Sequence, residues 1–375
     1  MERIAIFGGS FNPVHNEHIA LAKSAVKELN LDRLIVMPTF IAPHKTSQPA
    51  PANDRLNMLK LAFNGVDKVQ VSDFEIQKQG TSYTYLTVEH FKNTHDCELF
   101  FIVGADMLYD FKTWKNPQNI LSNCTLAVFD RDGQTTDFTK EREYFNKTFN
   151  KQFVVLKNVG KKQSSTAIRV YNSLGLDITN MTDKNVASYI NKNGLYQGDF
   201  VAEFIRNNLP EKRRIHTAEV TLCALQKAKE IGLDQKQVEI SAMLHDMAKY
   251  IDHTKVEGFT PPPDMPAPVI HAFLGAYMAE RILGITDKNI INAIKYHTSA
   301  RPQMTDLEKL IFVADMVEKG RDYQGVEILR ESFYNDDLDT CFKKCLKEEL
   351  VHLINKKQYI YIETLNASSY YLKDK

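Results

Sequence analysis

The first half of the chain alternates short apolar runs with segments of helical periodicity. Six apolar runs are predicted to be strands: 4–7, 34–37, 69–74, 99–104, 125–129 and 153–156. Most of these runs are continuous, which is typical of strands buried on both faces of a sheet. Between them, apolar residues recur at helical spacing, as at Ile19, Ala22 and Val26. Strands that alternate with helices predict an α/β fold with a doubly wound parallel sheet.

The second half has a different pattern, because the strand-like runs stop near residue 198. Seven long helical segments are predicted: 211–231, 235–251, 268–284, 287–297, 305–318, 322–333 and 336–356. A proline-rich segment, 259–268, is predicted to be a loop between two of them. We therefore expect an α/β domain over 1–196 and an all-α domain over 197–375.

Composition narrows the class of protein. A length of 375 residues favours two domains. Lys plus Arg and Asp plus Glu number 47 each, so no basic field indicates nucleic acid as a partner. No apolar run approaches the ~18–20 residues of a membrane span. The five cysteines are scattered and odd in number, which is typical of reduced thiols in a cytoplasmic protein. Oligomeric state has no signal in the sequence.

Candidate chemistry begins in the stretch GGSFNPVHNEH, directly after the first predicted strand. Ligands of open α/β sheets bind at the carboxyl ends of the strands, near the point where strand order reverses. Gly8 and Gly9 have no side chains, so phosphates can approach the backbone there. His15 and His18 lie where the next helix starts, and a helix N-terminus favours anions. Two imidazoles at that place can donate hydrogen bonds to phosphate oxygens.

The stretch GGSFNPVHNEH resembles the histidine signature of nucleotidyltransferases, most closely that of bacterial nicotinate-mononucleotide adenylyltransferases with a Rossmann-like domain. Further matching pieces follow in order across 1–196: APHK (42–45), Arg55, SYT (82–84), GADM (104–107), Trp114, SSTAIR (164–169) and NGLY (193–196). One departure is Glu17, which replaces a usual glycine and puts a carboxylate near the phosphate site.

The resemblance implies specific roles for residues of this chain. Catalysis would fall to His15, His18, Lys45 and Arg169. Substrates would be held by Gly8, Gly9, Ser10, Phe11, Tyr83, Thr84, Gly104, Asp106, Trp114, Ser164, Ser165 and Thr166. Gly104 and Asp106 would lie near adenosine, and Trp114 would stack on the pyridine ring. ATP with magnesium and nicotinate mononucleotide are the implied substrates. A cytidylyltransferase shares the histidine signature, but SSTAIR, SYT and Trp114 argue against it.

A second candidate site is centred on His245 and Asp246, which stand side by side in AMLHDMAKY. Neighbours on a helix point about 100° apart, so one ion can take the histidine while the carboxylate bridges to a second ion. Four more possible ligands lie on other predicted helices: His216, His271, His297 and Asp315. Nitrogen and oxygen ligands together favour iron or manganese over magnesium. We expect a buried site with two metal ions.

This pattern is similar to the HD phosphohydrolase superfamily. The words RIHTAEV, HDMAKY, YHTSARPQMT and ADMVEKGR resemble its symmetrical diadenosine-tetraphosphate hydrolases, over about 205–368. The resemblance implies that the six residues above bind metal and that Asp246 and Lys249 serve catalysis. It implies that Thr298, Arg301 and Arg321 bind substrate. Another nucleotide phosphohydrolase, or a nucleotide sensor without turnover, remains an alternative for this domain.

Overall fold

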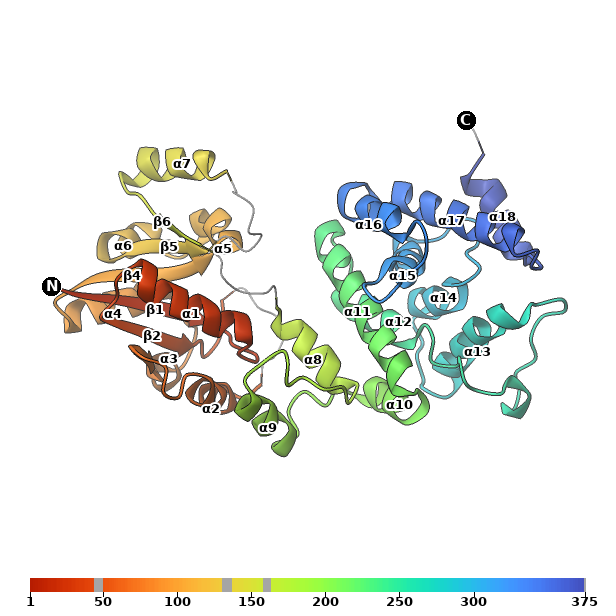
Figure 1. Ribbon diagram of the computed structural model, residues 1–375, viewed down its shortest axis with the longest axis horizontal. Coiled ribbons are helices and arrows are strands. Elements are labelled where there is room, and N and C mark those ends of the chain that lie inside the picture. Colours follow the sequence, from red (N-terminus) through yellow and green to blue (C-terminus); the bar gives the residue numbers. More distant parts are fainter. Residues whose placement is uncertain (44–49, 130–136, 158–162, 374–375) are drawn as a thin grey trace. The chain divides into compact units, whose positions relative to one another are not determined.

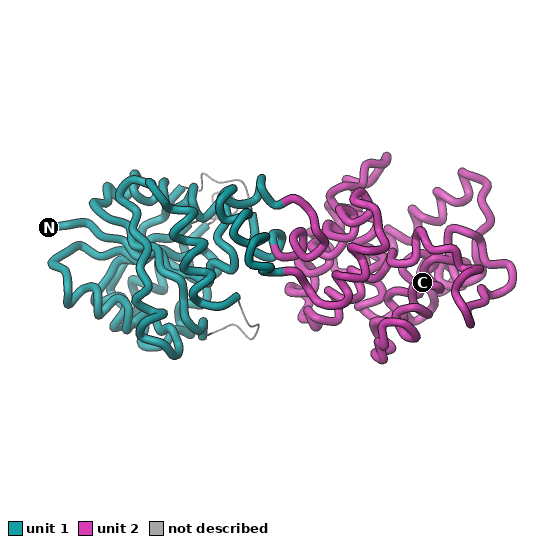
Figure 2. Tube along the Cα trace, turned by 90° about the horizontal axis from the view of Figure 1, so that it is seen from below, with its two compact units in different colours: residues 1–168, 178–196 teal, residues 169–177, 197–375 magenta. Residues whose placement is uncertain are grey.

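The computed structural model describes residues 1–43, 50–129, 137–157 and 163–373. The chain divides into two compact units, shown in different colours in Figure 2. Unit 1 comprises 1–168 and 178–196, and unit 2 comprises 169–177 and 197–375. Helix α8, Ser165–Ser173, therefore begins in unit 1 and ends in unit 2.

Unit 1 contains a parallel sheet of six strands in the order β3-β2-β1-β4-β5-β6. The strands are β1 (Glu2–Gly9), β2 (Arg33–Pro38), β3 (Val69–Val71), β4 (Cys97–Gly104), β5 (Thr125–Phe129) and β6 (Val154–Leu156). Each corresponds to a predicted strand, although β3 ends at Val71 and a short helix begins at Phe74, inside the segment predicted to be strand. Because β2 and β4 both pair with β1, strand order reverses on either side of β1.

Helices surround this sheet in unit 1 (Figure 1). They are α1 (Asn16–Glu28), α2 (Ala52–Ala62), α3 (Phe74–Lys78), α4 (Thr84–Thr94), α5 (Ala105–Tyr109), the 3-10 helix η1 (Phe111–Thr113), α6 (Pro117–Asn123), α7 (Thr139–Phe149) and α9 (Lys184–Lys192). Ile6 packs in a cluster with Phe91 of α4 and Phe145 of α7. Ala5, the residue before Ile6, points to the opposite face of the sheet and is also fully buried. The sheet is therefore covered on both faces. The predicted doubly wound α/β fold is confirmed.

Unit 2 contains helices joined by loops, with no strand among its described residues. Its helices are α10 (Phe200–Asn208), α11 (Glu211–Ile231), α12 (Gln235–Leu244), the 3-10 helix η2 (His253–Lys255), α13 (Ala267–Arg281), α14 (Lys288–Tyr296), α15 (Asp306–Val317), α16 (Val326–Asn335), α17 (Leu338–Asn355) and α18 (Ile362–Tyr371). None of the helices in the described part of the chain is long and apolar enough to cross a membrane.

One helix of unit 2 is shorter than predicted. The apolar pattern predicts a helix over 235–251, but α12 ends at Leu244 and turns follow. The periodicity continues past the helix end because Met247 and Ala248 are still buried in the core. His245 is therefore the residue that caps α12, rather than a residue in the middle of a helix.

Candidate active sites

The first candidate site lies at the carboxyl ends of β1 and β4. Gly9 ends β1 and Gly104 ends β4, so both backbones reach the same edge of the sheet. Gly9 is closely packed, since a Cβ atom there would lie 3.2 Å from two ring atoms of Phe11, and this ring would have to move by a few tenths of an ångström. Phe11 itself has a φ of 43°, in the left-handed region. The ring of Phe11 meets the ring of His18 edge-on, with centroids 4.9 Å apart.

His15 and His18 form one structural unit at the start of α1. Their rings are stacked with centroids 3.6 Å apart. Nδ1 of His15 accepts from the backbone N–H of His18 at 3.4 Å, and Nδ1 of His18 accepts from the N–H of His15 at 3.2 Å. Because a backbone amide can only donate, both Nδ1 atoms are acceptors, and each neutral ring carries its proton on Nε2. The helix cap therefore sets both imidazoles as Nε2–H donors.

The N-terminus of α8 is fastened to the same loop. Ser165 donates from Oγ to the carbonyl of Pro13 at 2.8 Å, and Oγ of Ser164 accepts from the N–H of Ala167 at 3.1 Å. Glu17 is buried, and its Oε2 accepts from the N–H of Gln163 at 3.2 Å. Its Oε1 has no hydrogen-bond partner among the described residues. The carboxylate of Glu17, at the motif position where glycine is usual, is therefore held against the backbone just before α8.

Arg55 joins the loops that follow β1 and β2. Its side chain is 1% exposed and donates to the carbonyls of Ser10, Phe40 and Ala50 at 2.9, 3.3 and 3.0 Å. Burial lowers the pKa of Arg55. Oγ of Ser82 accepts from the N–H of Phe40 at 2.9 Å, so the residues just before α4 are held against the same loops. Arg55 and Ser82 thus fix the backbone around the predicted substrate residues.

The predicted nicotinate residues lie at the start of α4 and after η1. Tyr83 caps α4, and the ammonium of Lys115 lies 4.3 Å from the centroid of its ring. Trp114 is half-buried and packs against Phe111, with centroids 5.3 Å apart. Its Nε1 is buried and has no partner among the described residues. Trp114 therefore contributes to core packing, and its contact with the pyridine ring stays a prediction.

Two of the other predicted residues lie on helices α5 and α8. Asp106 is exposed in the first turn of α5. Arg169 lies on the part of α8 that belongs to unit 2. Lys45 lies outside the described residues.

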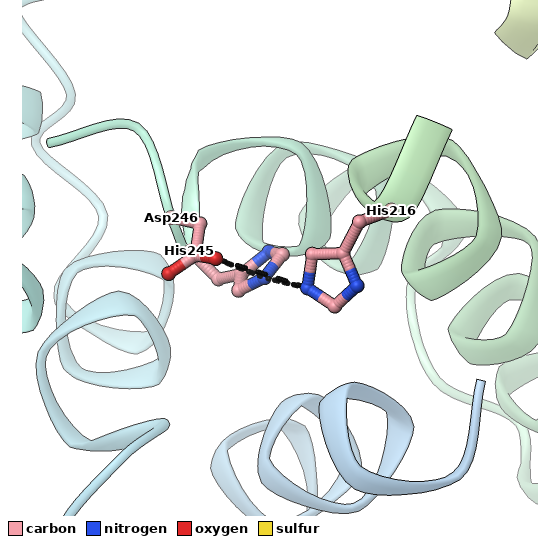
Figure 3. Close-up of side chains that lie close together, drawn as sticks. All are labelled: His216, His245 and Asp246. Atoms are coloured by element: carbon pink, nitrogen blue, oxygen red, sulfur yellow. Dashed lines mark hydrogen bonds and ion pairs between the residues drawn. The ribbon is translucent and has the colours of Figure 1, made fainter. Parts of the chain in front are cut away.

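The second candidate site is a buried cluster around Asp246. Oδ1 of Asp246 lies 2.9 Å from Nε2 of His271 and 3.6 Å from Nε2 of His297. Its Oδ2 lies 3.7 Å from Nε2 of both His216 and His245, as Figure 3 shows for these side chains. Two groups of possible metal ligands thus share one carboxylate: His216, His245 and Asp246, and then Asp246, His271 and His297. Each carboxylate oxygen faces one group.

Asp315 completes the first group. Its Oδ1 lies 3.0 Å from Nε2 of His216 and 3.8 Å from Nε2 of His245. The structure therefore brings together all six residues predicted as ligands, from α11, α13, α15 and the ends of α12 and α14.

Hydrogen bonds aim the histidines at the centre of the cluster. Nδ1 of His245 lies 2.6 Å from the carbonyl of Ala242, and Nδ1 of His297 lies 2.7 Å from the carbonyl of Ile294. A carbonyl only accepts, so these Nδ1 atoms carry the protons and the Nε2 lone pairs point inward. Nε2 of His245 lies 3.3 Å from Nε2 of His216. Two lone pairs that face each other at that distance repel, so a proton or a cation must lie between these nitrogens.

The charges of the cluster fit a divalent ion. Burial lowers the pKa of His245 to about 3, so this ligand is neutral. Burial alone would raise the pKa of Asp246, but the histidines around it outweigh burial and hold that pKa well below its usual range. Burial also lowers the pKa of His216, yet hydrogen bonds to Asp315 and Glu318 outweigh it and raise the pKa overall. A neutral imidazole at His245 beside an ionised carboxylate at Asp246 is the combination that metal binding requires.

Cations surround the cluster. Nζ of Lys249 lies 3.6 Å from Oδ1 of Asp246. Arg321 donates to the Asp315 carbonyl at 2.7 Å and also contacts its carboxylate. Oγ1 of Thr298 lies 3.1 Å from Nε2 of His297.

Arg301, also predicted to bind substrate, pairs with the buried Glu308 at 2.8 Å and lies over the ring of Tyr296. Its Nε is buried and has no hydrogen-bond partner among the described residues. Arg301 also donates to the carbonyl of Pro302 at 3.5 Å, so these three contacts are all to residues other than the six predicted metal ligands.

Comparison with known proteins finds a family model for each half of the chain. The cytidylyltransferase-like family model matches residues 6–170, and the HD domain model matches residues 213–320. A Mycoplasma genitalium protein described as a probable nicotinate-nucleotide adenylyltransferase/Ap4A hydrolase is 31% identical over 339 residues, covering 87% of this chain and 91% of that protein. The chain belongs to this family of two-domain enzymes.

Other members and partial relatives agree with this assignment. A Mycoplasma pneumoniae protein of the same description is 28% identical over 332 residues, covering 86% of this chain and 92% of that protein. A probable nicotinate-nucleotide adenylyltransferase of Clostridium novyi is 39% identical over 200 residues, which cover 52% of this chain and all of that protein. The nucleotidyltransferase half of the family thus also occurs as a separate protein.

Sequence reasoning missed two residues at the second site of this family member. Arg213 donates to Oδ2 of Asp246 at 2.6 Å, and Glu318 lies 3.0 Å from Nδ1 of His216. Both had a signal in the spacing, since Arg213 is three residues before His216 and Glu318 is three residues after Asp315. Residues three apart share a helix face, so each side chain lies on the same side of its helix as the predicted ligand three residues away and reaches the same cluster.

Proposed function

We propose that the first domain transfers the adenylyl group of ATP to nicotinate mononucleotide, giving nicotinate adenine dinucleotide and pyrophosphate. The observation that carries this proposal is the pair of Nε2–H donors, His15 and His18, at the start of α1. The mononucleotide phosphate attacks the α-phosphorus of ATP and pyrophosphate leaves, so no protein nucleophile is needed. The imidazoles stabilise charge that grows on the phosphate oxygens.

Other residues of this domain bind and orient the two substrates. Ser164, Ser165 and Thr166 lie at the start of α8, whose amides and dipole favour phosphate, and Arg169 adds a cation. Gly8, Gly9, Gly104 and Asp106 form the adenosine side, and Tyr83 and Trp114 receive the pyridine ring. Lys45 would add a further positive charge. Magnesium bound to ATP would neutralise the triphosphate.

The acid mononucleotide is the expected substrate rather than the amide. Thr84 is the first residue of α4, so unpaired backbone amides there can favour a carboxylate. The test compares the specificity constants of nicotinate and nicotinamide mononucleotides. Equal constants would contradict this preference without affecting the assignment of adenylyl transfer.

For the second domain, we propose hydrolysis of diadenosine tetraphosphate into two ADP. The carrying observation is the bridging arrangement at Asp246, with one carboxylate oxygen toward each histidine group. Iron or manganese, as two ions, suits these nitrogen and oxygen donors. When bound, the ions would activate water and neutralise phosphate charge.

The residues beside the ligands hold the phosphate chain. Lys249 and Arg321 lie next to the ligand carboxylates. If metal ions were to neutralise these carboxylates, both cations could contact phosphate oxygens of the substrate instead. Thr298 offers a hydroxyl at the same place, and Arg301 is anchored by Glu308 to reach one flank. Cations on both flanks would centre the chain of four phosphates on the metal site, so cleavage would fall in the middle of the chain.

The experiment uses the whole chain and two inactivating variants as reciprocal controls. His18→Ala should lower dinucleotide synthesis by about 10²–10³ and leave hydrolysis intact, whereas Asp246→Ala should abolish hydrolysis and leave synthesis intact. Products of diadenosine tetraphosphate are separated by chromatography. Two ADP support the proposal, and AMP with ATP would mean asymmetric cleavage. No products from metal-loaded protein would favour a nucleotide sensor, and cleavage only of other nucleotides a different phosphohydrolase.

A further inference from the structure

Glu318 is a buried carboxylate at the second site that no predicted role uses. It caps the end of α15, and its side chain is 3% exposed. Oε1 accepts from Nδ1 of His216 at 3.0 Å. We propose that Glu318 is a positioning residue that holds His216 as a metal ligand and strengthens its bond to the ion. This inference rests on the proposed metal-dependent function of the cluster.

His216 needs such a partner because of where it lies. His245 and His297 stand at the ends of α12 and α14, where helix carbonyls are not used by later turns. Their Nδ1 atoms therefore find the backbone of Ala242 and Ile294. His216 is inside α11, where the carbonyls are already bonded within the helix. Its Nδ1 proton requires an acceptor from another element, and Glu318 supplies it.

The carboxylate of Glu318 is itself held in place. Its Oε2 accepts from the N–H of Gly320, so each oxygen has one donor. A Cβ atom at Gly320 would lie 3.1 and 3.2 Å from the two carboxylate oxygens, which leaves little room for a side chain. Nε of Arg321 lies 3.9 Å from Oε1. Four residues of the word ADMVEKGR thus serve one ligand group: Asp315, Glu318, Gly320 and Arg321.

A charged acceptor changes more than the ring orientation. When Nδ1–H donates to a carboxylate, the electron density at Nε2 rises and the imidazole becomes a stronger ligand. His245 and His297 donate to neutral carbonyls, so among these three ligands His216 alone has this support. Loss of such a partner typically lowers metal affinity by about 10–100-fold. The same fall is expected for Glu318→Ala.

The test measures manganese binding to the full chain, independently of hydrolysis. Metal-stripped protein is titrated with Mn²⁺, and free Mn²⁺ is followed by electron paramagnetic resonance. Glu318→Ala should bind about 10–100-fold more weakly than the parent. The affinity of Glu318→Gln should fall between them, because its amide keeps one acceptor oxygen and puts an NH2 group in place of the other. Hydrolysis of diadenosine tetraphosphate at saturating Mn²⁺ should recover most of its turnover in both variants.

The matched control is Glu308→Ala, which also removes a fully buried carboxylate from α15 but touches no ligand. Its Mn²⁺ affinity should equal that of the parent. Unchanged affinity in both Glu318 variants would overturn the inference while leaving the proposed function intact. Equal weakening in Glu308→Ala and Glu318→Ala would also overturn it, since general loosening would then explain both. A parent chain that binds no Mn²⁺ would overturn the inference and the metal-dependent function together.

Discussion

Replacement of His18 by alanine removes both roles of this side chain, as a donor at the phosphate site and as a cap of α1. His18 offers Nε2–H toward the phosphate site, and its Nδ1 also accepts from the N–H of His15 at 3.2 Å. The alanine variant loses the donor, the cap and the stack on His15. We expect turnover of dinucleotide synthesis to fall by about 10²–10³, since one donor to transition-state charge contributes about 2.7–4 kcal/mol.

The structural cost of the same change should be much smaller. Loss of one helix-capping interaction costs about 0.5–2 kcal/mol. His18→Gln is the matched variant, because glutamine at this position of a capping box can still accept from the backbone N–H. It should restore most of the lost stability while its turnover remains well below that of the parent. Stability and turnover would then be separated by two variants at one position.

The assay combines steady-state kinetics with urea unfolding. Trp114 is the only tryptophan of the chain and lies in unit 1, so its fluorescence reports on this domain. KM for ATP should change little if His18 acts mainly on charge that develops during the reaction. Near-parental turnover in His18→Ala would refute the phosphate role. If turnover fell only in proportion to the fraction of unfolded protein, His18 would be a helix cap without a role at the phosphates.

Three further outcomes are expected. Asp246→Ala should abolish hydrolysis and lower bound metal, whereas Arg301→Ala should keep the metal and raise KM; parental metal content in the first variant would contradict the bridging role. Glu17→Gln should tighten ATP binding, because it removes a buried negative charge near the phosphates, and weaker binding would count against this reasoning. Burial raises the pKa of Glu75, so the folded domain takes up that proton more readily than the unfolded chain. Stability should rise as pH falls through this pKa, and Glu75→Gln should remove the rise in urea unfolding followed by Trp114.

Strands and ligands were predictable because strong local patterns report on them. Apolar runs, most of them continuous, predicted all six strands, since residues buried on both faces leave no alternation. The cluster at the second site was predictable because histidines and aspartates on separate helices have few other reasons to be buried. The end of β3 was not predictable, because Phe74 continues the apolar run while its backbone turns into α3.

The supporting residues were harder to find than the groups they support. Glu17 departs from the motif, and its burial depends on the approach to α8, far away in sequence. Arg55 was visible as part of a motif, but its bonds to the carbonyls of Ser10 and Phe40 follow from how two loops meet. Such roles depend on tertiary contacts between backbone atoms, which leave no periodicity in the chain.

Histidines at helix ends in the two domains present opposite groups, because they stand at opposite ends of their helices. His15 and His18 lie at the start of α1, where unpaired backbone N–H groups make Nδ1 an acceptor and leave the proton on Nε2. His245 and His297 lie at the ends of α12 and α14, where carbonyls make Nδ1 a donor and leave a lone pair on Nε2. The first arrangement suits an anion and the second suits a metal ion. The place of a histidine relative to a helix end therefore predicts which charge its outer nitrogen will meet.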